Sequence, residues 1–456
     1  MISDVLEKAL KVTVDLSSFQ SDRHFKAAAD VLFRLQRAGF HSFFVGGAVR
    51  DIMIGRRPKD WDVLTTAHPD TVAELFPGSD LVGAGFGVTI VKTDTGSVEV
   101  ATARRERFYM DGRHPEKVEY TVDVSIDVLR RDFTINALLL DPGSSCVYDF
   151  TGGIADISKG IIRTIGEAET RFREDYLRML RCIRFAARFD FAIEADTFAA
   201  IRELSPLTGQ LAPERIRCEL DMMLTGNNSG KAFRLLEKSG LLHILLPEVA
   251  ILRNFAQPPE YHPEGDVLEH TLLMLDHIVS PSAVLAWGVL FHDLGKAATF
   301  SLTENGRIHF FEHEKAGLPI AEKIMERLRF SRADIKDIIY LVANHMRFGT
   351  VKAEAKLRRY EGHGLFAECL ELNRLDAISG NKIFTQYILY LDRMIAREGE
   401  NALPAPFITG DDLIAAGYIP EKSFGRVLAK TYDAQLEGIL SDKKTALAYA
   451  EKLLVR

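Results

Sequence analysis

Residues 42–66 read SFFVGGAVRDIMIGRRPKDWDVLTT, and this stretch contains two aspartates, Asp60 and Asp62, separated by one residue. On an extended strand, alternate side chains lie on one face, so the spacing predicts that both carboxylates point the same way. Carboxylate oxygens are the ligands that hard divalent cations such as Mg²⁺ prefer. The stretch therefore predicts a strand, a turn and a second strand that carries a site for divalent cations.

The glycine pair before these acids predicts a phosphate-binding turn. Gly46 and Gly47 carry no Cβ, so backbone amides can approach phosphate oxygens, and Arg50 adds a charged clamp. A glycine pair alone is a weak signal, but metal-assisted phosphoryl-type transfer needs both this turn and the acids. Glu99 is a candidate third carboxylate, although an exposed strand acid is an equally good interpretation.

The composition predicts a multidomain globular chain. Its 456 residues exceed one ordinary domain, and 47% of them are hydrophobic and 27% charged. The formal net charge of -7 argues against a uniformly basic coat for nucleic acid. The stretch 163–188, which contains seven arginines and four acidic residues, is a candidate for a local basic patch. Four dispersed cysteines, no signal segment and no apolar run of about 20 residues predict a cytoplasmic protein without a membrane partner.

Periodicity predicts an α/β head followed by a long helical body. Apolar residues recur at helical spacing over 20–40 and end at Gly39. Alternating runs at 80–92, 97–103, 116–121 and 145–149 predict a mixed sheet of about five strands, and helices dominate after residue 165. The proline-rich stretches 255–265 and 403–410 are interpreted as linkers.

A third motif, REDYLRMLRCIRFAARF at 173–189, predicts a base-reading surface. Asp175, Arg178, Arg181 and Arg184 follow one another at intervals of three, which on a single helix forms a slanting strip. A carboxylate only accepts hydrogen bonds and an arginine only donates them. Because cytosine and adenine each offer an amino donor beside a ring-nitrogen acceptor, this pair of residue types selects C and A over G and U.

Together with GGAVRD, GRRPKDWDV and RRDFTINAL at 130–138, this motif resembles the bacterial class II tRNA nucleotidyltransferase and poly(A) polymerase family over about residues 40–250. The resemblance implies an α+β multidomain fold with a polymerase-β-like head, a mixed sheet and helical domains behind it. It also implies metal binding by Asp60 and Asp62, with Asp132 and Asn136 as sugar or loop organisers. The implied nucleotide-binding residues are Gly47, Arg50, Arg131, Asp175, Arg178, Arg181 and Arg184.

Residues 270–376 carry a second set of metal-ligand side chains. His292 and Asp293 are adjacent in HDLGK, and such a pair can encircle one or two divalent ions together with a distant His and Asp. The pattern resembles the HD phosphohydrolase superfamily over about 266–380. This resemblance implies His270, His292, Asp293 and Asp376 as ligands. His313 and His345 are candidates for a second metal or a phosphate, and Lys296 is a candidate for binding phosphate; His309 also lies downstream. Hydrolysis and a purely structural role both stay open.

The resemblance implies four segments: a head at 1–160, a neck and body at 161–255, an HD domain at 256–400 and a tRNA-contacting helical tail at 401–456. It implies template-independent addition of CCA to the tRNA 3′ end from CTP and ATP, with Mg²⁺ in the head. The charged segment 104–121 resembles the loop that full CCA adders and A-adding enzymes carry, and residues 83–87 (GAGFG) differ from the basic run of poly(A) polymerases. A-adding, poly(A)-adding and HD phosphodiesterase or phosphatase activities remain alternatives, and the oligomeric state is open.

Overall fold

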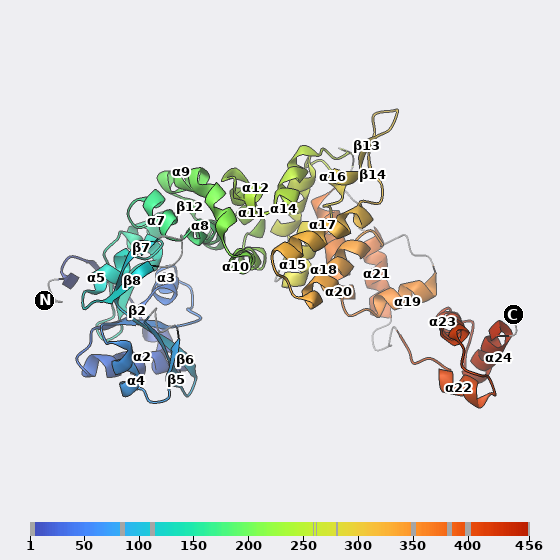
Figure 1. Ribbon diagram of the computed structural model, residues 1–456, viewed down its shortest axis with the longest axis horizontal. Coiled ribbons are helices and arrows are strands. Elements are labelled where there is room, and N and C mark those ends of the chain that lie inside the picture. Colours follow the sequence, from blue (N-terminus) through green and yellow to red (C-terminus); the bar gives the residue numbers. More distant parts are fainter. Residues whose placement is uncertain are drawn as a thin grey trace. The chain divides into compact units, whose positions relative to one another are not determined.

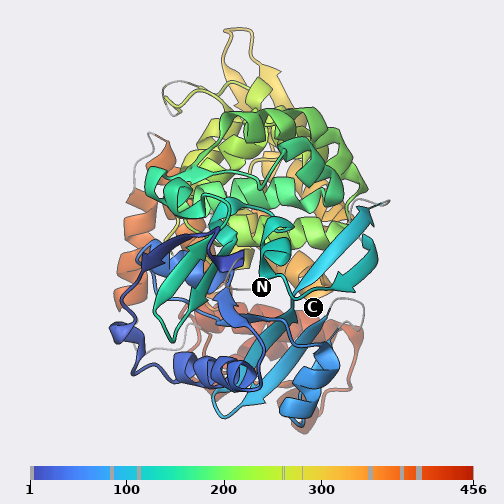
Figure 2. The same ribbon diagram turned by 90° about the vertical axis from the view of Figure 1, so that its left-hand side faces the viewer.

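The computed structural model describes residues 5–82, 87–109, 115–258, 260, 262–279, 281–347, 353–380, 385–396 and 403–454. The chain forms two compact units, Met1–Leu245 and Leu246–Arg456. Figures 1 and 2 show strands gathered in the N-terminal part and helices over most of the remainder. The predicted mixed-sheet head followed by largely helical domains is therefore confirmed.

The main sheet of the head contains eight of the described strands, so the expected number of about five is wrong. Their order is β1-β10-β9-β2-β3-β6-β5-β4, with only β3 and β6 parallel. Two strands escaped prediction: β1 is short with mostly exposed residues, and β9 is apolar without alternation. The strands are β1 (Leu10–Thr13), β2 (Ser42–Val45), β3 (Asp62–Thr65), β4 (Asp80–Val82), β5 (Val88–Thr93), β6 (Gly96–Thr102), β9 (Leu138–Asp141) and β10 (Cys146–Asp149).

The charged segment 104–121 forms a separate hairpin. Its strands β7 (Arg104–Tyr109) and β8 (Pro115–Tyr120) pair with each other and not with the main sheet, so the predicted strand 116–121 was assigned to the wrong sheet. Residues 110–114 of this segment and residues 83–86 of the glycine-rich stretch lie outside the described residues.

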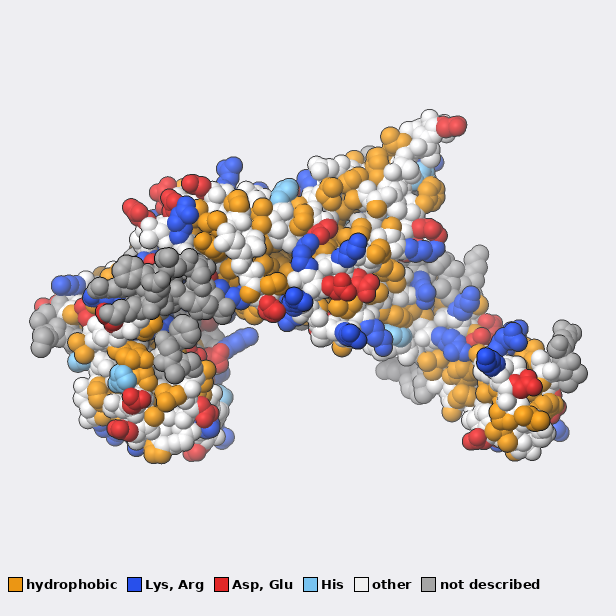
Figure 3. All heavy atoms as spheres, in the orientation of Figure 1, with side chains coloured by type: hydrophobic (Ala, Val, Ile, Leu, Met, Phe, Trp, Pro, Cys, Tyr) orange, Lys and Arg blue, Asp and Glu red, His pale blue; other side chains and the backbone are white. Residues whose placement is uncertain are grey.

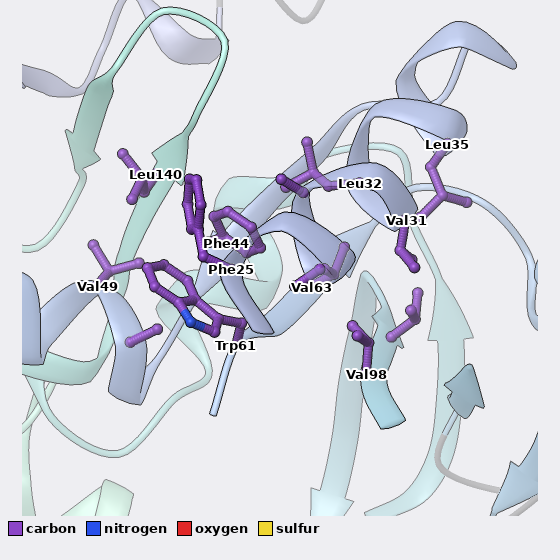
Figure 4. Packing of buried hydrophobic residues seen from close by; sticks show 14 of the residues in the cluster. Phe25, Val31, Leu32, Leu35, Phe44, Val49, Trp61, Val63, Val98 and Leu140 are labelled. Carbon is purple, nitrogen blue, oxygen red and sulfur yellow. The ribbon is translucent and has the colours of Figure 1, made fainter. Parts of the chain in front are cut away.

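The predicted N-terminal helix is α2 (Arg23–Arg37), and it packs against the sheet (Figure 4). Asp22 starts it by accepting hydrogen bonds from two backbone amides of the first turn. The ring of Trp61 lies 4.8 Å from that of Phe25 and 4.9 Å from that of Phe44. Since Trp61 points into this core, its neighbours Asp60 and Asp62 point away from it.

The other elements of the first unit complete the head and build a helical neck. The head helices are η1 (Ser17–Phe19), α3 (Gly47–Met53), α4 (Pro69–Leu75), α5 (Val124–Leu129), η2 (Thr134–Asn136) and α6 (Gly153–Lys159). The neck contains β11 (Ile161–Ile162), α7 (Ala168–Glu174), α8 (Leu177–Phe189), β12 (Ala192–Ile193), α9 (Ala195–Leu204), η3 (Ser205–Gln210), α10 (Pro213–Leu224), α11 (Ser229–Lys238) and α12 (Leu241–Leu245). Helix α8 packs against α10 and α11.

The second unit is built mainly from helices. It begins with α13 (Pro247–Ala250), η4 (Ile251–Asn254), α14 (Val267–Asp276), α15 (Ala283–Phe291), α16 (Lys296–Thr299), β13 (Phe300–Leu302) and β14 (Ile308–Phe310). It continues with α17 (His313–Arg327), α18 (Arg332–Asn344), α19 (Glu354–Glu361), α20 (Phe366–Ser379), α21 (Thr385–Ala396), α22 (Gly410–Ala415), α23 (Lys422–Leu436) and α24 (Lys443–Leu454). None of the described helices is long and apolar enough to cross a membrane.

The stretch 255–265 is not a free linker, and that prediction is wrong. Ala256 pairs with Asp266 in a β-bridge, and the side chains of Gln257 and His262 are buried. Lys296 donates a hydrogen bond to Gln257 at 2.6 Å. The described residues Gln257 and His262 therefore anchor this stretch in the second unit.

Candidate active site

A cavity of about 570 Å³ lies in the first unit where α3, the start of β3 and α8 meet. Nine basic and five acidic side chains line it, a balance that suits an anionic ligand. The residues predicted for the head and neck lie together in its wall: Gly47, Arg50, Asp60, Asp62, Arg131, Asp175, Arg178, Arg181 and Arg184. Four further basic residues in this wall were not predicted: Lys59, Arg130, Arg188 and Arg215.

The paired acids stand at the N-terminal end of β3. Asp62 is its first residue and Asp60 precedes it, and both line the cavity. Burial, followed by the negative charge of Glu99, raises the pKa of Asp62 to about 6, although Arg131 opposes this and Asp60 adds to it. Glu99 lies on the neighbouring strand β6, whose Val100 pairs with Val63. Crowded carboxylates that repel one another suit a divalent cation, because its charge relieves the repulsion.

The glycine turn brings the backbone next to these acids. Gly46 adopts a positive φ of 71°, a conformation that favours glycine, directly before α3. A Cβ atom built there would lie 3.5 Å from Nη1 of Arg131 and 4.0 Å from Oδ2 of Asp62. The turn therefore forms one wall of the cavity at the carboxylate end.

A hydrogen-bond network connects the head to the neck. Nη1 of Arg50 donates to Oδ1 of Asn136 at 2.6 Å, and Nδ2 of Asn136 donates to Oδ1 of Asp132 at 3.0 Å. Arg181 on α8 donates through Nε to Oδ2 of Asp132 at 2.8 Å. Although burial opposes ionisation, Arg181 and Asn136 lower the pKa of Asp132 to about 2. RRDFTINAL therefore connects the glycine turn to helix α8.

The strip predicted along one helix is interrupted at its first residue. Helix α7 ends at Glu174, and Asp175 has extended backbone angles (φ −151°, ψ 108°) before α8 begins. Its Oδ1 accepts a hydrogen bond from the amide of Leu177 at 3.1 Å, which holds the carboxylate at the helix break. The single-helix placement of Asp175 was therefore wrong, although Asp175 and Arg178 line the same cavity.

Helix α10 holds two of the base-reading candidates through partners that sequence reasoning missed. Arg215 Nη2 donates to Oδ2 of Asp175 at 2.8 Å, and Arg184 Nε donates to Oε2 of buried Glu219 at 2.6 Å. Arg215 and Glu219 are four residues apart, so they share one helix face. In the sequence ERIRCEL (214–220), this spacing of Arg215 and Glu219 was the signal that could have predicted a polar helix face. Arg178 is paired as well, with Glu174 at 2.5 Å.

Three of the predicted ligands of the second unit, His292, Asp293 and Asp376, line a cavity of about 190 Å³, and His270 contacts Asp376 beside it. His270 Nε2 lies 2.9 Å from Oδ1 of Asp376, and His292 Nε2 lies 3.0 Å from Oδ2 of Asp293. His313 joins them, with Nε2 3.3 Å from Oδ1 of Asp293. His345 and Lys296 also line the cavity, whereas His309 lies on β14 and stacks on Phe311 instead. We call His270, His292, Asp293, His313, His345 and Asp376 the His/Asp cluster.

The His/Asp cluster suits a divalent metal ion. Candidate ligand atoms of His270, His292 and Asp293 lie within 4.8 Å of one another, as do those of Asp293, His313 and His345. Nε2 of His292 and Oδ2 of Asp293 are buried and make no well-aligned hydrogen bond to the described residues, although they lie 3.0 Å apart and Nζ of Lys296 lies 2.7 Å from Oδ2 of Asp293. Because a buried polar atom is costly to leave unsatisfied, these two atoms fit metal coordination. His262 and Glu264, which sequence reasoning assigned to a linker, adjoin the cluster.

The fold and the paired-acid cavity define the class of protein as a nucleotidyltransferase with a helical neck. Family models match three segments: Poly A polymerase head domain at residues 42–163, Probable RNA and SrmB- binding site of polymerase A at 190–252, and HD domain at 266–380. The CCA-adding enzyme of Enterococcus faecalis is 30% identical over 437 residues, which cover 94% of this chain and 96% of that protein. The chain belongs to the class II CCA-adding enzyme family.

Other relatives align over a shorter part. The CCA-adding enzyme of Geobacillus thermodenitrificans is 40% identical over 217 residues, which cover 48% of this chain and 54% of that protein. Alignments with three such relatives cover 54%, 56% and 58% of the relatives' own length, so the chain spans about half of each. The Bacillus stearothermophilus CCA-adding enzyme in complex with CTP shares the fold, with a TM-score of 0.70, 24% identity and coverage of 95% of this chain and 99% of that one.

Proposed function

We propose that this protein adds CMP, CMP and AMP to the 3′ end of tRNA, using CTP and ATP and releasing pyrophosphate. The observation that carries the proposal is the shared cavity, in which Asp60 and Asp62 lie with Asp175 and Arg178. Relatives supply the substrates: solved CCA-adding enzymes include complexes with CTP, with ATP and, from Thermotoga maritima, with tRNA.

Each part of the cavity has a role in this proposal. Asp60 and Asp62 would hold Mg²⁺, which when bound supplies charge for the triphosphate and activates the 3′ hydroxyl. Arg50 and the amide of Gly47 bind phosphate oxygens. Asp175 accepts from the amino group of cytosine or adenine, and Arg178 donates to the neighbouring ring nitrogen. Glu99 as a third metal ligand, the tRNA-contacting tail and the cytoplasmic location stay predictions.

A ladder of substrates tests the reaction. Purified protein receives three tRNAs that end before CCA, after C and after CC, with labelled CTP or ATP. Addition of exactly the missing nucleotides to all three supports CCA addition. Extension of only the tRNA ending in CC, by one A, supports an A-adding enzyme, and long A tracts support a poly(A) polymerase. Either of the last two results overturns the proposal.

A second candidate function, hydrolysis of phosphoesters at the His/Asp cluster, is favoured by the buried Nε2 of His292 and Oδ2 of Asp293, which make no well-aligned hydrogen bond to the described residues. The His/Asp cluster would hold one or two divalent ions, which when bound supply an activated water. Lys296, whose Nζ lies 2.7 Å from Oδ2 of Asp293, is placed to neutralise a phosphate. Cleavage of a generic phosphodiester by the wild-type protein, but not by a His292→Ala variant, would support this hydrolase function. Equal cleavage by both proteins, or by neither, would contradict it.

A further inference from the structure

Glu264 lies behind the His/Asp cluster and is nearly enclosed, with its side chain 5% exposed. Its Oε1 lies 2.7 Å from Nδ1 of His270 and 2.8 Å from Nδ1 of His262. It comes from the segment 255–265, which packs beside α14 through the pairing of Ala256 with Asp266. Glu264 therefore contacts a candidate metal ligand, His270, without lining the cavity itself.

This contact decides which nitrogen of His270 faces the cluster. A carboxylate accepts hydrogen bonds, so both ring nitrogens of His270 are placed to donate, Nδ1 to Glu264 and Nε2 to Asp376; a metal ion bound at Nε2 would replace that hydrogen and leave Nδ1 as the donor. The opposite nitrogen, Nε2, points to Asp376 at 2.9 Å, on the side of the other cluster residues. A histidine that binds a metal through one nitrogen commonly donates from its other nitrogen to a carboxylate, which fixes the ring orientation.

We propose that Glu264 is a positioning residue that keeps the hydrogen on Nδ1 of His270 and thereby presents Nε2 to a divalent cation in the His/Asp cluster. His262 supports it from the other side, because its hydrogen bond to the same Oε1 restrains the Glu264 carboxylate. The rings of His262 and His270 pack edge to face with centroids 4.7 Å apart, so the ring of His270 has little freedom to turn.

This inference rests on the proposed metal binding of the His/Asp cluster and is independent of nucleotide addition. The test uses metal-free full-length protein titrated with Co²⁺. Affinity is measured by competition with a chromogenic chelator, and the visible absorption of bound Co²⁺ reports its coordination. The variants are Glu264→Ala, Glu264→Gln and His262→Ala. Glu304→Ala, an exposed glutamate between β13 and β14, is the matched control.

We expect Glu264→Ala to weaken Co²⁺ binding by about 10- to 100-fold and to alter its spectrum. Glu264→Gln should recover part of the affinity, because its amide oxygen still accepts from Nδ1. His262→Ala should have a smaller effect, and the control none. If Glu264→Ala or Glu264→Gln lowers only thermal stability and leaves affinity and spectrum unchanged, the positioning role is wrong.

Two further outcomes also overturn the proposal in distinguishable ways. In the first, Glu264→Ala binds one Co²⁺ ion fewer than the parent and binds the remaining ions with unchanged affinity. Glu264 would then be a metal ligand itself, together with His262. Absence of Co²⁺ binding by the wild-type protein contradicts metal binding by the His/Asp cluster itself. Should Glu264→Ala not fold, the conservative Glu264→Gln variant decides, since it must show weakened binding for the proposal to stand.

Discussion

Asp132 and Arg181 join the sheet-containing head to the neck helix α8 through a two-point ion pair, with Nε and Nη2 of Arg181 at 2.8 Å and 2.7 Å from Oδ2 of Asp132. The other carboxylate oxygen of Asp132 accepts from Asn136, which in turn accepts from Arg50. The guanidinium of Arg50 also lies 4.7 Å from the ring centre of Phe189 on α8. One network therefore fixes α3, which follows the glycine turn, relative to helix α8.

Breaking this ion pair should destabilise the first unit. We expect Asp132→Asn to cost about 2 to 4 kcal/mol, because removing one partner leaves the charge of Arg181 uncompensated. The two tryptophans are Trp61 in the first unit and Trp287 in the second, so a Trp287→Phe background lets Trp61 fluorescence report on the first unit alone. The exposed acid Asp70, changed to Asn, is the control. Equal unfolding midpoints for both variants would contradict the expectation.

The same pair should make stability depend on acid pH. The pKa of Asp132 is lowered from 3.8 to about 2, so the folded state favours the charged form. Its contribution, about 2 kcal/mol, is complete above pH 4 and is lost as the pH falls from about 4 through 2. Trp61 unfolding curves should therefore show a steeper loss of stability over this range in the parent than in Asp132→Asn. If the parent protein and Asp132→Asn lose stability in parallel as the pH falls, the contribution of the Asp132 charge is contradicted.

Removing either paired acid should abolish nucleotide addition. We expect Asp60→Ala and Asp62→Ala each to lower the rate of CMP incorporation into truncated tRNA by at least about 100-fold, because phosphoryl-type transfer depends on the metal charge these acids hold. Asp70→Ala serves as the matched control, since this aspartate is exposed outside the cavity. Incorporation at the normal rate in both cavity variants would remove the basis of the proposed mechanism.

When no metal is bound, the ionised carboxylate of Asp62 should lower the folding stability of the first unit. Its pKa is raised from 3.8 to about 6, so the folded state binds the proton more tightly than the unfolded state. Its favourable contribution is present below pH 4 and is lost as the pH rises through 6. At pH 7.5 without divalent ions, Asp62→Asn should therefore melt a few degrees higher, as followed by Trp61 fluorescence. Added Mg²⁺ should stabilise only the parent, and an Asp62→Asn variant that melts lower would contradict this sign.

The partner of Asp175 on α10 should tune base selection. We expect Asp175→Ala to lower the preference for CTP over UTP, measured as the ratio of kcat/KM values, by about 10- to 100-fold, since one discriminating acceptor is lost. Arg215→Ala should cause a smaller loss, because Asp175 then keeps its charge but loses its anchor. Arg217→Ala on the same helix, whose side chain pairs with Asp221, is the control. Unchanged selectivity in Asp175→Ala would exclude a role in base reading.

The two candidate sites lie in different units, so substitutions in one should not affect the activity of the other. His292→Ala with Asp293→Ala should abolish divalent metal retention by the His/Asp cluster while CMP addition continues near the parental rate. Metal content after dialysis and addition to truncated tRNA can be measured on one preparation. Collapse of addition in a folded double variant would contradict the independence of the sites. Figure 3 shows basic and acidic side chains interspersed on the displayed face, which is not a uniformly basic coat.

Much of the head followed from local pattern in the sequence. The i, i+2 spacing of Asp60 and Asp62 placed both acids on one side of the chain because Trp61 between them enters the core. Helical periodicity over 20–40, ended by Gly39, predicted α2, which the structure bounds at Arg23–Arg37. These features depend on neighbouring residues only, so backbone geometry and side-chain alternation were sufficient to predict them.

Only tertiary contacts between segments distant in the chain decided the remainder. Arg215 reaches Asp175 across 40 residues, and His270 meets Asp376 across 106. The stretch that includes Glu264 has the composition of a linker, yet it packs behind a buried histidine. Periodicity describes which face of an element is apolar and says nothing of which polar side chains meet across elements. Those pairings depend on how the helices pack, which no local pattern encodes.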